Sequence, residues 1–320
     1  MRLLLAAVLL TAALCACTTQ RAKIPAEPVY PWFNFTWYKA QVAGRTFDKA
    51  AMLVPVQLLG LRGNFVAQFD LGSDGTSLYE NALRNYFASR AQLYATVDTT
   101  QRLVSDGGQV SYVTAGLPLH VGPTIIAHPV LARGAGELVS KDSLHSTTPK
   151  MIGTIGANFP KGKVLIIDYP RQRMCVLDSV DTYWRARTTF VASRMRKGRL
   201  HIPLTINQHT YWALFDTGAS LFPLSTDEHT WKTLVATGPP TDSMRVSSWG
   251  EQVAFYGAPI QSDVYLGATK LPRGQAWFNR NKRLLAFNAE EQIAALTGNG
   301  FFSTSILVLD YQRNRFGVVY

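Results

Sequence analysis

The stretch Phe215-Asp216-Thr217-Gly218-Ala219-Ser220 places a single carboxylate on a tight glycine turn between two apolar runs, residues 211–215 and 221–224. A carboxylate at the end of a buried strand is costly unless its charge is used or hydrogen-bonded. A second version of this turn lies upstream, Phe69-Asp70-Leu71-Gly72-Ser73. The two stretches indicate that the chain contains two copies of one half-site.

Further landmarks repeat in the same order after each aspartate. Asp70 and Asp216 are 146 positions apart (216 minus 70). Three other pairs keep separations of 142 to 145 positions: Gln109 with Gln252, Gly122 with Gly267, and Asp168 with Asp310. Four pairs of residues would not keep nearly the same separation by chance, so we infer an internal duplication. Short apolar segments separated by glycine turns predict an all-β-dominated protein of two pseudo-symmetric lobes with a few short helices.

Two local patterns predict particular elements of the first half. Ser77 and Glu80 fit a capping box, so we expect a helix to follow the first aspartate turn. Residues 102–113 are expected to form a hairpin, because Asp106-Gly107-Gly108 separates two apolar runs.

Length and composition describe a globular chain large enough for two lobes. It has 320 residues, of which 47% are hydrophobic and 17% charged. The predicted organisation is a leader at 1–17, a tether and docking strand at 18–48, an N-terminal lobe at 49–180, an inter-lobe connection at 181–198 and a C-terminal lobe at 199–320.

The leader has the pattern of an export signal. Arg2 precedes an apolar run over residues 3–14, too short for a membrane-spanning helix. The sequence Leu14-Cys15-Ala16-Cys17 resembles a bacterial lipobox, which implies cleavage before Cys17 and lipidation of that residue. We therefore expect an exported lipoprotein, anchored to a membrane and facing the periplasm or the extracellular side. An ordinary secretory signal is the alternative.

The net charge of +11 is spread without a run of five basic residues. A solvated basic surface explains this positive charge. Weak attraction to an anionic membrane is the more specific alternative. Aromatic residues do not alternate with basic runs, so nucleic-acid binding is not expected. The six histidines are scattered, and there is no cysteine pair for zinc and no Gly-x-Ser-x-Gly elbow. The sequence therefore predicts neither a metal nor a cofactor.

Paired carboxylates on equivalent turns suit one chemistry in particular. Two carboxylates held close share a proton, so one can take a proton from water while the other polarises a carbonyl. Each turn is also followed by a glycine segment, residues 154–160 after the first and 296–302 after the second. Over residues 50–320 the chain resembles the bilobed, pepsin-like aspartic peptidases, in which such segments pack behind Asp-Thr-Gly turns.

That resemblance implies the site residues. Asp70 and Asp216 are the catalytic pair, Gly72 and Gly218 set the turns, and Ser73 and Thr217 orient the carboxylates. The hairpin occupies the place of the family's substrate-covering flap, with Asp106, Gly107 and Tyr112 as substrate-binding residues. The implied function is a membrane-anchored aspartic endopeptidase acting on a peptide or protein substrate.

Three departures from the family pattern leave an alternative open. Leu71 replaces a threonine that, in the family, bonds across to the other turn. Ala219 lacks a hydroxyl that usually bonds its carboxylate, from which we expect activity nearer neutral pH. Thr297 interrupts the apolar segment behind the second turn. The alternatives are buried aspartates that merely accept backbone N–H bonds, and a degenerate relative that binds peptide or a protein partner without cutting it.

Overall fold

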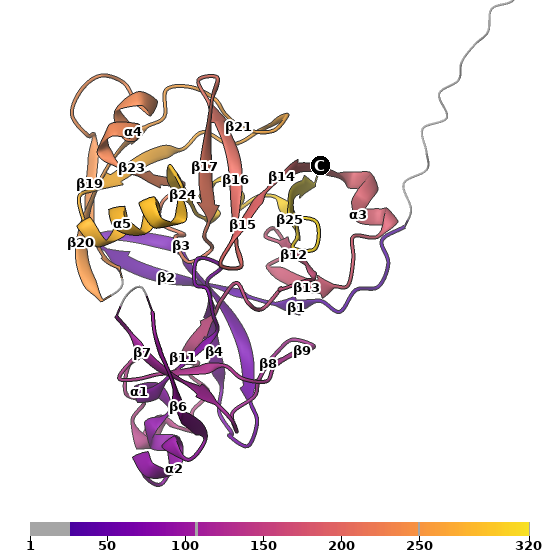
Figure 1. Cartoon of the computed structure of the whole chain (residues 1–320), viewed down its shortest axis with the longest axis vertical. Coiled ribbons are helices and arrows are strands. Elements are labelled where there is room, and N and C mark those ends of the chain that lie inside the picture. The colour runs from indigo at the N-terminus through magenta and orange to yellow at the C-terminus, as the bar shows by residue number, and fades with distance from the viewer. Residues whose placement is uncertain (1–25, 106–107, 249, 320) are drawn as a thin grey trace, which may run out of the picture.

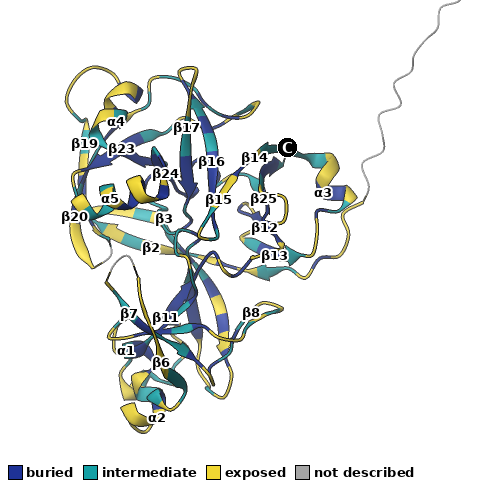
Figure 2. Ribbon diagram, in the orientation of Figure 1, coloured by how far each residue is buried: buried dark blue, intermediate teal, exposed yellow. Residues whose placement is uncertain are grey.

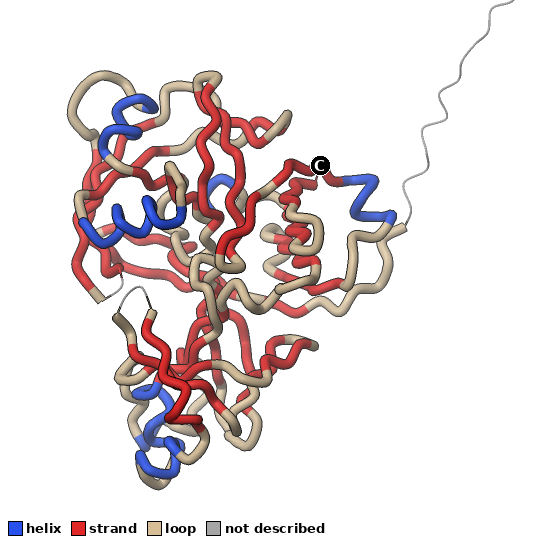
Figure 3. Tube along the Cα trace, viewed as in Figure 1, coloured by secondary structure: helices blue, strands red, loops and turns tan. Residues whose placement is uncertain are grey.

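Two ten-stranded sheets with the same strand order organise the chain (Figure 1). The computed structural model describes residues 26–105, 108–248 and 250–319, so the predicted leader and Cys17 lie outside the described residues. Strands account for far more of the described residues than helices do, and the helices are short (Figure 3). This is the all-β-dominated, two-lobed architecture predicted from the sequence.

The first sheet forms the N-terminal lobe. In order of pairing it contains β6 (Val97–Val104), β7 (Val110–Thr114), β10 (Val130–Ala132), β5 (Ser77–Tyr79), β11 (Lys150–Ile155), β4 (Phe65–Phe69), β3 (Arg45–Leu58), β8 (Leu119–Val121) and β9 (Thr124–Ile126), with β2 (Thr36–Val42) beside β3.

The second sheet repeats this order strand for strand. It contains β19 (Asp242–Ser248), β20 (Glu251–Pro259), β23 (Gln275–Asn279), β18 (Leu224–Thr226), β24 (Ala295–Thr297), β17 (His209–Phe215), β16 (Arg199–Ile206), β21 (Val264–Leu266) and β22 (Thr269–Lys270), with β15 (Arg194–Arg196) beside β16. The paired landmarks also coincide: Gly122 and Gly267 make equivalent turns with φ of 54° and 58°. Glycine suits this left-handed conformation.

A six-stranded sheet joins the lobes. Its order is β1 (Phe33–Asn34), β13 (Arg173–Leu177), β12 (Val164–Asp168), β25 (Ile306–Asp310), β26 (Arg315–Val319) and β14 (Thr188–Ala192). The central pair, β12 and β25, comes one strand from each half of the chain, so this sheet has the same two-fold pattern. The C-terminal end of the chain lies in it (Figure 1).

The helices lie on the outside of this framework. They are α1 (Glu80–Leu83), α2 (Arg90–Tyr94), α3 (Thr182–Arg187), α4 (Glu228–Leu234) and α5 (Lys282–Glu291), with 3-10 turns at Arg84–Tyr86, Lys141–Ser143 and Asn299–Phe301. In the described part of the chain, no helix is long and apolar enough to cross a membrane.

The predicted capping box is wrong. Ser77 begins strand β5, which pairs with β10 and β11, and the N-cap of α1 is Tyr79 without a side-chain hydrogen bond. Glu80 is buried instead, and its carboxylate accepts from the Arg90 Nε at 2.7 Å and from the Gly134 N–H at 2.8 Å. Tertiary pairing of the strand therefore overrides the local cap signal.

The segment before the first lobe lies on the body of the protein. β1 pairs with β13 and β2 pairs with β3, which continues without a break from residue 45 into the lobe. The region 181–198 holds α3, β14 and β15.

Buried residues concentrate on the sheets (Figure 2), and one hydrophobic core contains residues of both lobes, including Phe69 and Phe215.

Candidate active site

The two aspartate turns occupy equivalent places in the two lobes. Asp70 follows β4 directly, and Asp216 follows β17. Each of these strands pairs in parallel with the strand that leads into its lobe's downstream glycine segment, β11 or β24. The Asp70 N–H donates to the Ile155 carbonyl and the Asp216 N–H to the Thr297 carbonyl, both at 3.0 Å. The fold thus fixes both carboxylates by the same backbone geometry.

Each carboxylate lies against the glycine of the other lobe. A Cβ atom added to Gly72 would stand 2.4 Å from the Cγ of Asp216, and one added to Gly218 would stand 2.5 Å from the Cγ of Asp70. Real Cβ atoms do not approach so closely, so the two turns meet at a distance that only glycine permits. The structure therefore brings together the four residues that the duplication predicts.

Backbone N–H groups orient the carboxylates. The Oδ1 of Asp70 accepts from the N–H of Gly72 at 3.0 Å and of Ser73 at 3.1 Å. The Oδ1 of Asp216 accepts from the N–H of Gly218 at 2.7 Å. The two carboxyl groups are also hydrogen-bonded to each other. Such a bond requires one of them to carry a proton.

Burial and mutual repulsion hold the proton in this pair. Burial raises the pKa of Asp70 well above its usual range, and the negative charge of Asp216 adds to the increase. Burial also raises the pKa of Asp216, against the hydrogen bonds from Asp70 and from the N–H groups of Gly218, Ala219 and Gly72. The two buried carboxyl groups therefore share one proton as a pair.

Thr217 links the two turns from one side. It is fully buried; its Oγ donates to the Phe69 carbonyl and accepts from the Leu71 N–H, both at 2.9 Å. Leu71 has no hydroxyl with which to make the matching bond from the first lobe, and its side chain is 1% exposed in the core. The two turns are thus linked by the hydroxyl of Thr217 alone, and not by one hydroxyl from each lobe.

The downstream glycine segments pack behind the turns as the resemblance implies. A Cβ on Gly156 would stand 2.3 Å from the Gly75 carbonyl oxygen, and one on Gly298 would stand 1.9 Å from that of Ala219. The Thr297 side chain, which interrupts the apolar pattern, donates to the Pro223 carbonyl at 2.9 Å. This hydrogen bond explains how a buried hydroxyl is tolerated there.

Ser73 makes a different contact from the one expected of it. Its hydroxyl donates to the Gly75 carbonyl at 3.0 Å, and it reaches Asp70 through its backbone N–H. The second lobe has Ala219 at the equivalent position. A hydroxyl has one proton to donate, so neither position supplies a hydroxyl donor to its carboxylate.

The predicted hairpin is present as β6 and β7. Asp106 and Gly107 lie outside the described residues. Tyr112 shares one face of the sheet with Leu131 and Leu78, whereas Tyr79, Ala132 and Ser111 share the other.

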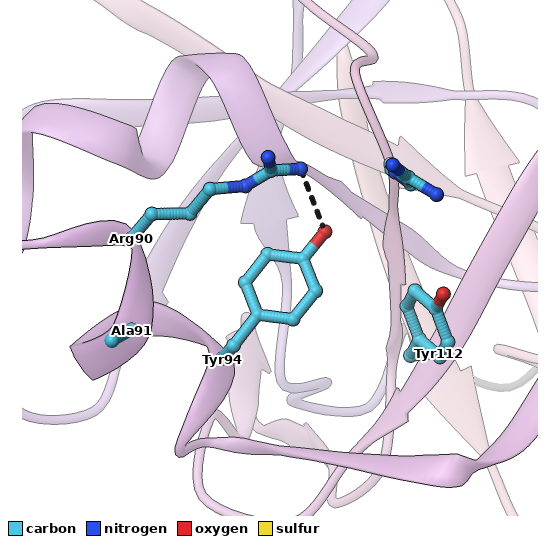
Figure 4. Close-up of a pocket in the computed structure, with 5 residues that line it drawn as sticks. Arg90, Ala91, Tyr94 and Tyr112 are labelled. Carbon is cyan, nitrogen blue, oxygen red and sulfur yellow. Dashed lines mark hydrogen bonds between the residues drawn. The ribbon is translucent and has the colours of Figure 1, made fainter.

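The Tyr112 ring packs against Tyr94 of α2, with ring centroids 6.0 Å apart. Both rings line a shallow pocket of about 410 Å³, together with Arg90, Ala91 and Arg133 (Figure 4). The structure thus does not bring Tyr112 to the aspartate pair.

Tyr79, at the end of β5, is a partly buried neighbour of β11 that the sequence reasoning did not consider. Burial raises its pKa, the hydrogen-bonded Thr154 hydroxyl opposes this, and the charge of Asp70 raises it further. The hydroxyl is hydrogen-bonded to Thr154, whose neighbour Ile155 accepts from the Asp70 N–H. The capping-box interpretation concealed this residue, because it placed Tyr79 in a helix.

In the described ranges, no group of three or more His, Cys, Asp or Glu side chains could hold a metal ion. Cys175 is buried in the six-stranded sheet, and burial raises the pKa of its thiol to about 12. A buried thiol with a raised pKa is chemically inert.

Comparisons with known proteins found similarity among solved structures only. No protein-family model matches the sequence, and no curated protein matches it. Among solved structures, the chain is similar to an aspartic proteinase from Irpex lacteus, with 12% identity, 90% of this chain and 96% of that chain covered, and a TM-score of 0.48. It is also similar to basic 7S globulin from soybean, with 9% identity, coverage of 90% and 93%, and a TM-score of 0.47.

The assignment of the fold rests on the strand order and the paired turns. Two equivalent lobes, a shared six-stranded sheet and one Asp turn from each lobe define a two-lobed, pepsin-like fold.

Proposed function

We propose that the protein is an aspartic endopeptidase that hydrolyses peptide bonds with a water molecule activated between Asp70 and Asp216. The observation that carries this proposal is that each carboxylate lies directly against the glycine in the turn of the other lobe. A merely structural aspartate would be satisfied by its own turn and would not need a second carboxylate beside it.

The shared proton gives the pair one ionised and one neutral member, and we take Asp216 as the ionised one and Asp70 as the neutral one. Ionised Asp216 takes a proton from the water as its oxygen attacks the carbonyl carbon of the substrate, and neutral Asp70 donates its proton to the carbonyl oxygen. The tetrahedral diol then collapses: its hydroxyl proton returns to Asp70, Asp216 gives its proton to the amide nitrogen, and the C–N bond breaks. Each proton that is taken up is returned, so the pair ends the cycle as it began.

The surrounding residues hold this arrangement. Gly72 and Gly218 permit the close approach, and Thr217 fixes one turn to the other. Because the donors to the carboxylates are backbone N–H groups, little reorganisation is needed during the reaction.

A non-cutting, peptide-binding relative is the second candidate, and Leu71 favours it. The missing hydroxyl removes one of the two links between the turns. Loosening of the pair by a fraction of an ångström could impair catalysis while leaving the fold intact.

The test is cleavage of an unfolded protein substrate by the full chain and by Asp70→Asn and Asp216→Asn. We expect each substitution to lower kcat/KM on the order of 10⁴-fold or more, as for other catalytic groups that act as a unit. A statine-containing inhibitor such as pepstatin should block the same cleavage. Cleavage that survives both substitutions would assign the activity to another site.

We propose in addition that the chain is exported and anchored through lipidated Cys17, which rests on the sequence of the leader alone. Metabolic labelling with palmitate should mark the wild type and not Cys17→Ala. Equal labelling of both proteins, or of neither, would contradict the anchor.

A further inference from the structure

A buried ionic cluster touches the first aspartate turn from the second lobe. Arg199, at the start of β16, donates through Nη2 to Glu291 Oε1 at 2.7 Å and through Nη1 to the Gly72 carbonyl at 3.2 Å. The His201 Nε2 lies 3.2 Å from Glu291 Oε2. These side chains are nearly inaccessible: Arg199 and His201 are each 3% exposed and Glu291 is 1% exposed.

The cluster exists in one lobe only. Strand registers make β3 the counterpart of β16, because Leu53 pairs with Gln68 as His201 pairs with Leu214. The counterparts of His201 and Arg199 in the first lobe are therefore Leu53 and Ala51. The first lobe thus has two apolar residues at the positions where the second lobe has a buried guanidinium and an imidazole. Burying a guanidinium is costly even when it is paired, so this asymmetry needs a reason beyond packing.

The contact with Gly72 leads directly to the catalytic pair. The Gly72 carbonyl and the Ser73 N–H belong to the same peptide group, and that N–H donates to Asp70 Oδ1 at 3.1 Å. A cation on the carbonyl polarises the peptide and strengthens its N–H as a donor. Arg199, the peptide group and Asp70 thus form one continuous hydrogen-bonded chain.

The same contact lies next to the missing cross-link. The Leu71 side chain has no hydroxyl that could bond across to the second lobe, and Gly72 is the next residue along the chain. The first turn is therefore held by two side chains of the second lobe, Thr217 at Leu71 and Arg199 at Gly72.

We propose that Arg199, held by Glu291 and His201, is a positioning residue that orients the Gly72–Ser73 peptide toward Asp70 and replaces the cross-link lost at Leu71. This inference rests on the proposed function for its catalytic consequence, but its effect on Asp70 does not require cleavage. The charged or titratable groups that act on Arg199 and His201 include Glu291, Glu290 and Arg196.

The test removes the ionic cluster without leaving a buried charge that has lost its partner. Arg199→Met alone leaves the buried Glu291 beside His201 but without its guanidinium partner, so the main variant is Arg199→Met/Glu291→Gln. Arg199→Lys keeps the charge and should restore part of the effect. Arg194→Met is the matched control, because Arg194 is exposed and stacks on Trp212 at 3.7 Å from the ring centroid.

The first readout is the pH profile of peptide cleavage. A weaker donor raises the pKa of Asp70, so the alkaline limb for the double variant should move upward by about half a pH unit. We expect kcat to fall about 10-fold with KM little changed, since the contact is to the turn and not to substrate. A superimposable profile with unchanged kcat would overturn the proposal.

The second readout is thermal unfolding against pH, with and without Asp70→Asn, and it applies even if the protein cuts nothing. The double variant should change the pH dependence of Tm when Asp70 is present and leave it unchanged in the Asp70→Asn background. An equal change in both backgrounds would show a structural role only and would contradict the proposal. Failure of cleavage in every protein would instead count against the proposed function.

Discussion

Gly72 and Gly218 determine how closely the two carboxylates approach. Their missing side chains leave the space in which the opposite carboxyl group lies, and no other residue fits that space without displacing an aspartate. The pairing of the aspartates is thus encoded as much by the glycines as by the acids themselves.

Gly72→Ala tests this claim, with Gly75→Ala in the same turn as its control. The new methyl group would force Asp216 away from its position, whereas a Cβ on Gly75 meets nothing within 4 Å. We expect Gly72→Ala to lower kcat/KM by about 10²-fold or more, and Gly75→Ala to stay within a few-fold of the wild type. Equal rates for the two variants would contradict the close approach.

Thr217→Val tests the single cross-link. Valine has nearly the same shape but leaves the Phe69 carbonyl and the Leu71 N–H without their partner. Each buried group left unpaired costs about 1 to 3 kcal/mol, so unfolding in urea should show a loss of about 2 to 5 kcal/mol. Thr217→Ser keeps the hydroxyl and should lose much less; a loss as large as that of valine would assign the effect to the methyl group.

Asp70→Asn should stabilise the protein at neutral pH. The pKa of Asp70 is raised in the folded state, so the native protein binds a proton more tightly than the unfolded chain does, and stability falls as pH rises above about 4. Asparagine cannot ionise and escapes this loss. The Tm of the variant should therefore exceed that of the wild type at pH 7, with the gap closing below about pH 4. A constant gap at every pH would count against a raised pKa.

At the scale of elements, the six-stranded sheet repeats one corner in each half. Asp168 ends β12 and accepts from the Arg171 N–H and the Arg173 side chain. Asp310 ends β25 and accepts in the same way from Arg313 and Arg315. These corners fix the turns into β13 and β26, and both aspartates are buried.

Asp168→Ala and Asp310→Ala should therefore have matching effects. Each removes an acceptor for a backbone N–H and an arginine, and hydrogen bonds to charged groups contribute about 1.5 to 3 kcal/mol. We expect each variant to lose about 2 to 3 kcal/mol of unfolding free energy in urea. Asp178→Ala is the control, because Asp178 is exposed and forms a surface ion pair with Lys163. A loss at only one corner would contradict their equivalence.

The elements that sequence predicted best are those whose signals are local. Asp-Gly between apolar runs predicted the hairpin of β6 and β7, and the paired landmarks Gly122 and Gly267 lie in the turns of two smaller, equivalent hairpins. The capping box failed because Ser77 is held in a strand by two neighbours distant in sequence. Tyr112 has a suitable side chain, but the register turns it toward α2.

At the scale of the whole molecule, the duplication predicted the pairing of the aspartates, because equivalent turns in a two-fold arrangement meet near the axis. It could not predict Arg199, since that residue has no counterpart in the first lobe. Its role depends on a contact between β16 and Gly72 that no spacing reveals. Asymmetric features of a duplicated chain therefore require the structure.

A long hairpin also connects the lobes. β2 and β3 extend from the first lobe between the two halves and end beside β19 and β20 (Figure 1). Arg45 forms two hydrogen bonds with Asp242, and Val42 and Phe47 pack on a hydrophobic cluster of the second lobe. The lobes are thus joined by this hairpin, by the six-stranded sheet and by the aspartate turns.

The most direct test of the central claim is cleavage of a mixed peptide library by the full chain between pH 3 and pH 8, beside Asp216→Asn. The amide side chain of this variant cannot take a proton from water, so we predict that the wild type cuts and that the folded variant does not. Neither Ser73 nor Ala219 supplies a hydroxyl donor to its carboxylate, and we therefore expect activity that extends toward neutral pH. No cleavage at any pH by folded wild type would contradict the account and favour a peptide-binding protein, with Leu71→Thr as the variant to examine next.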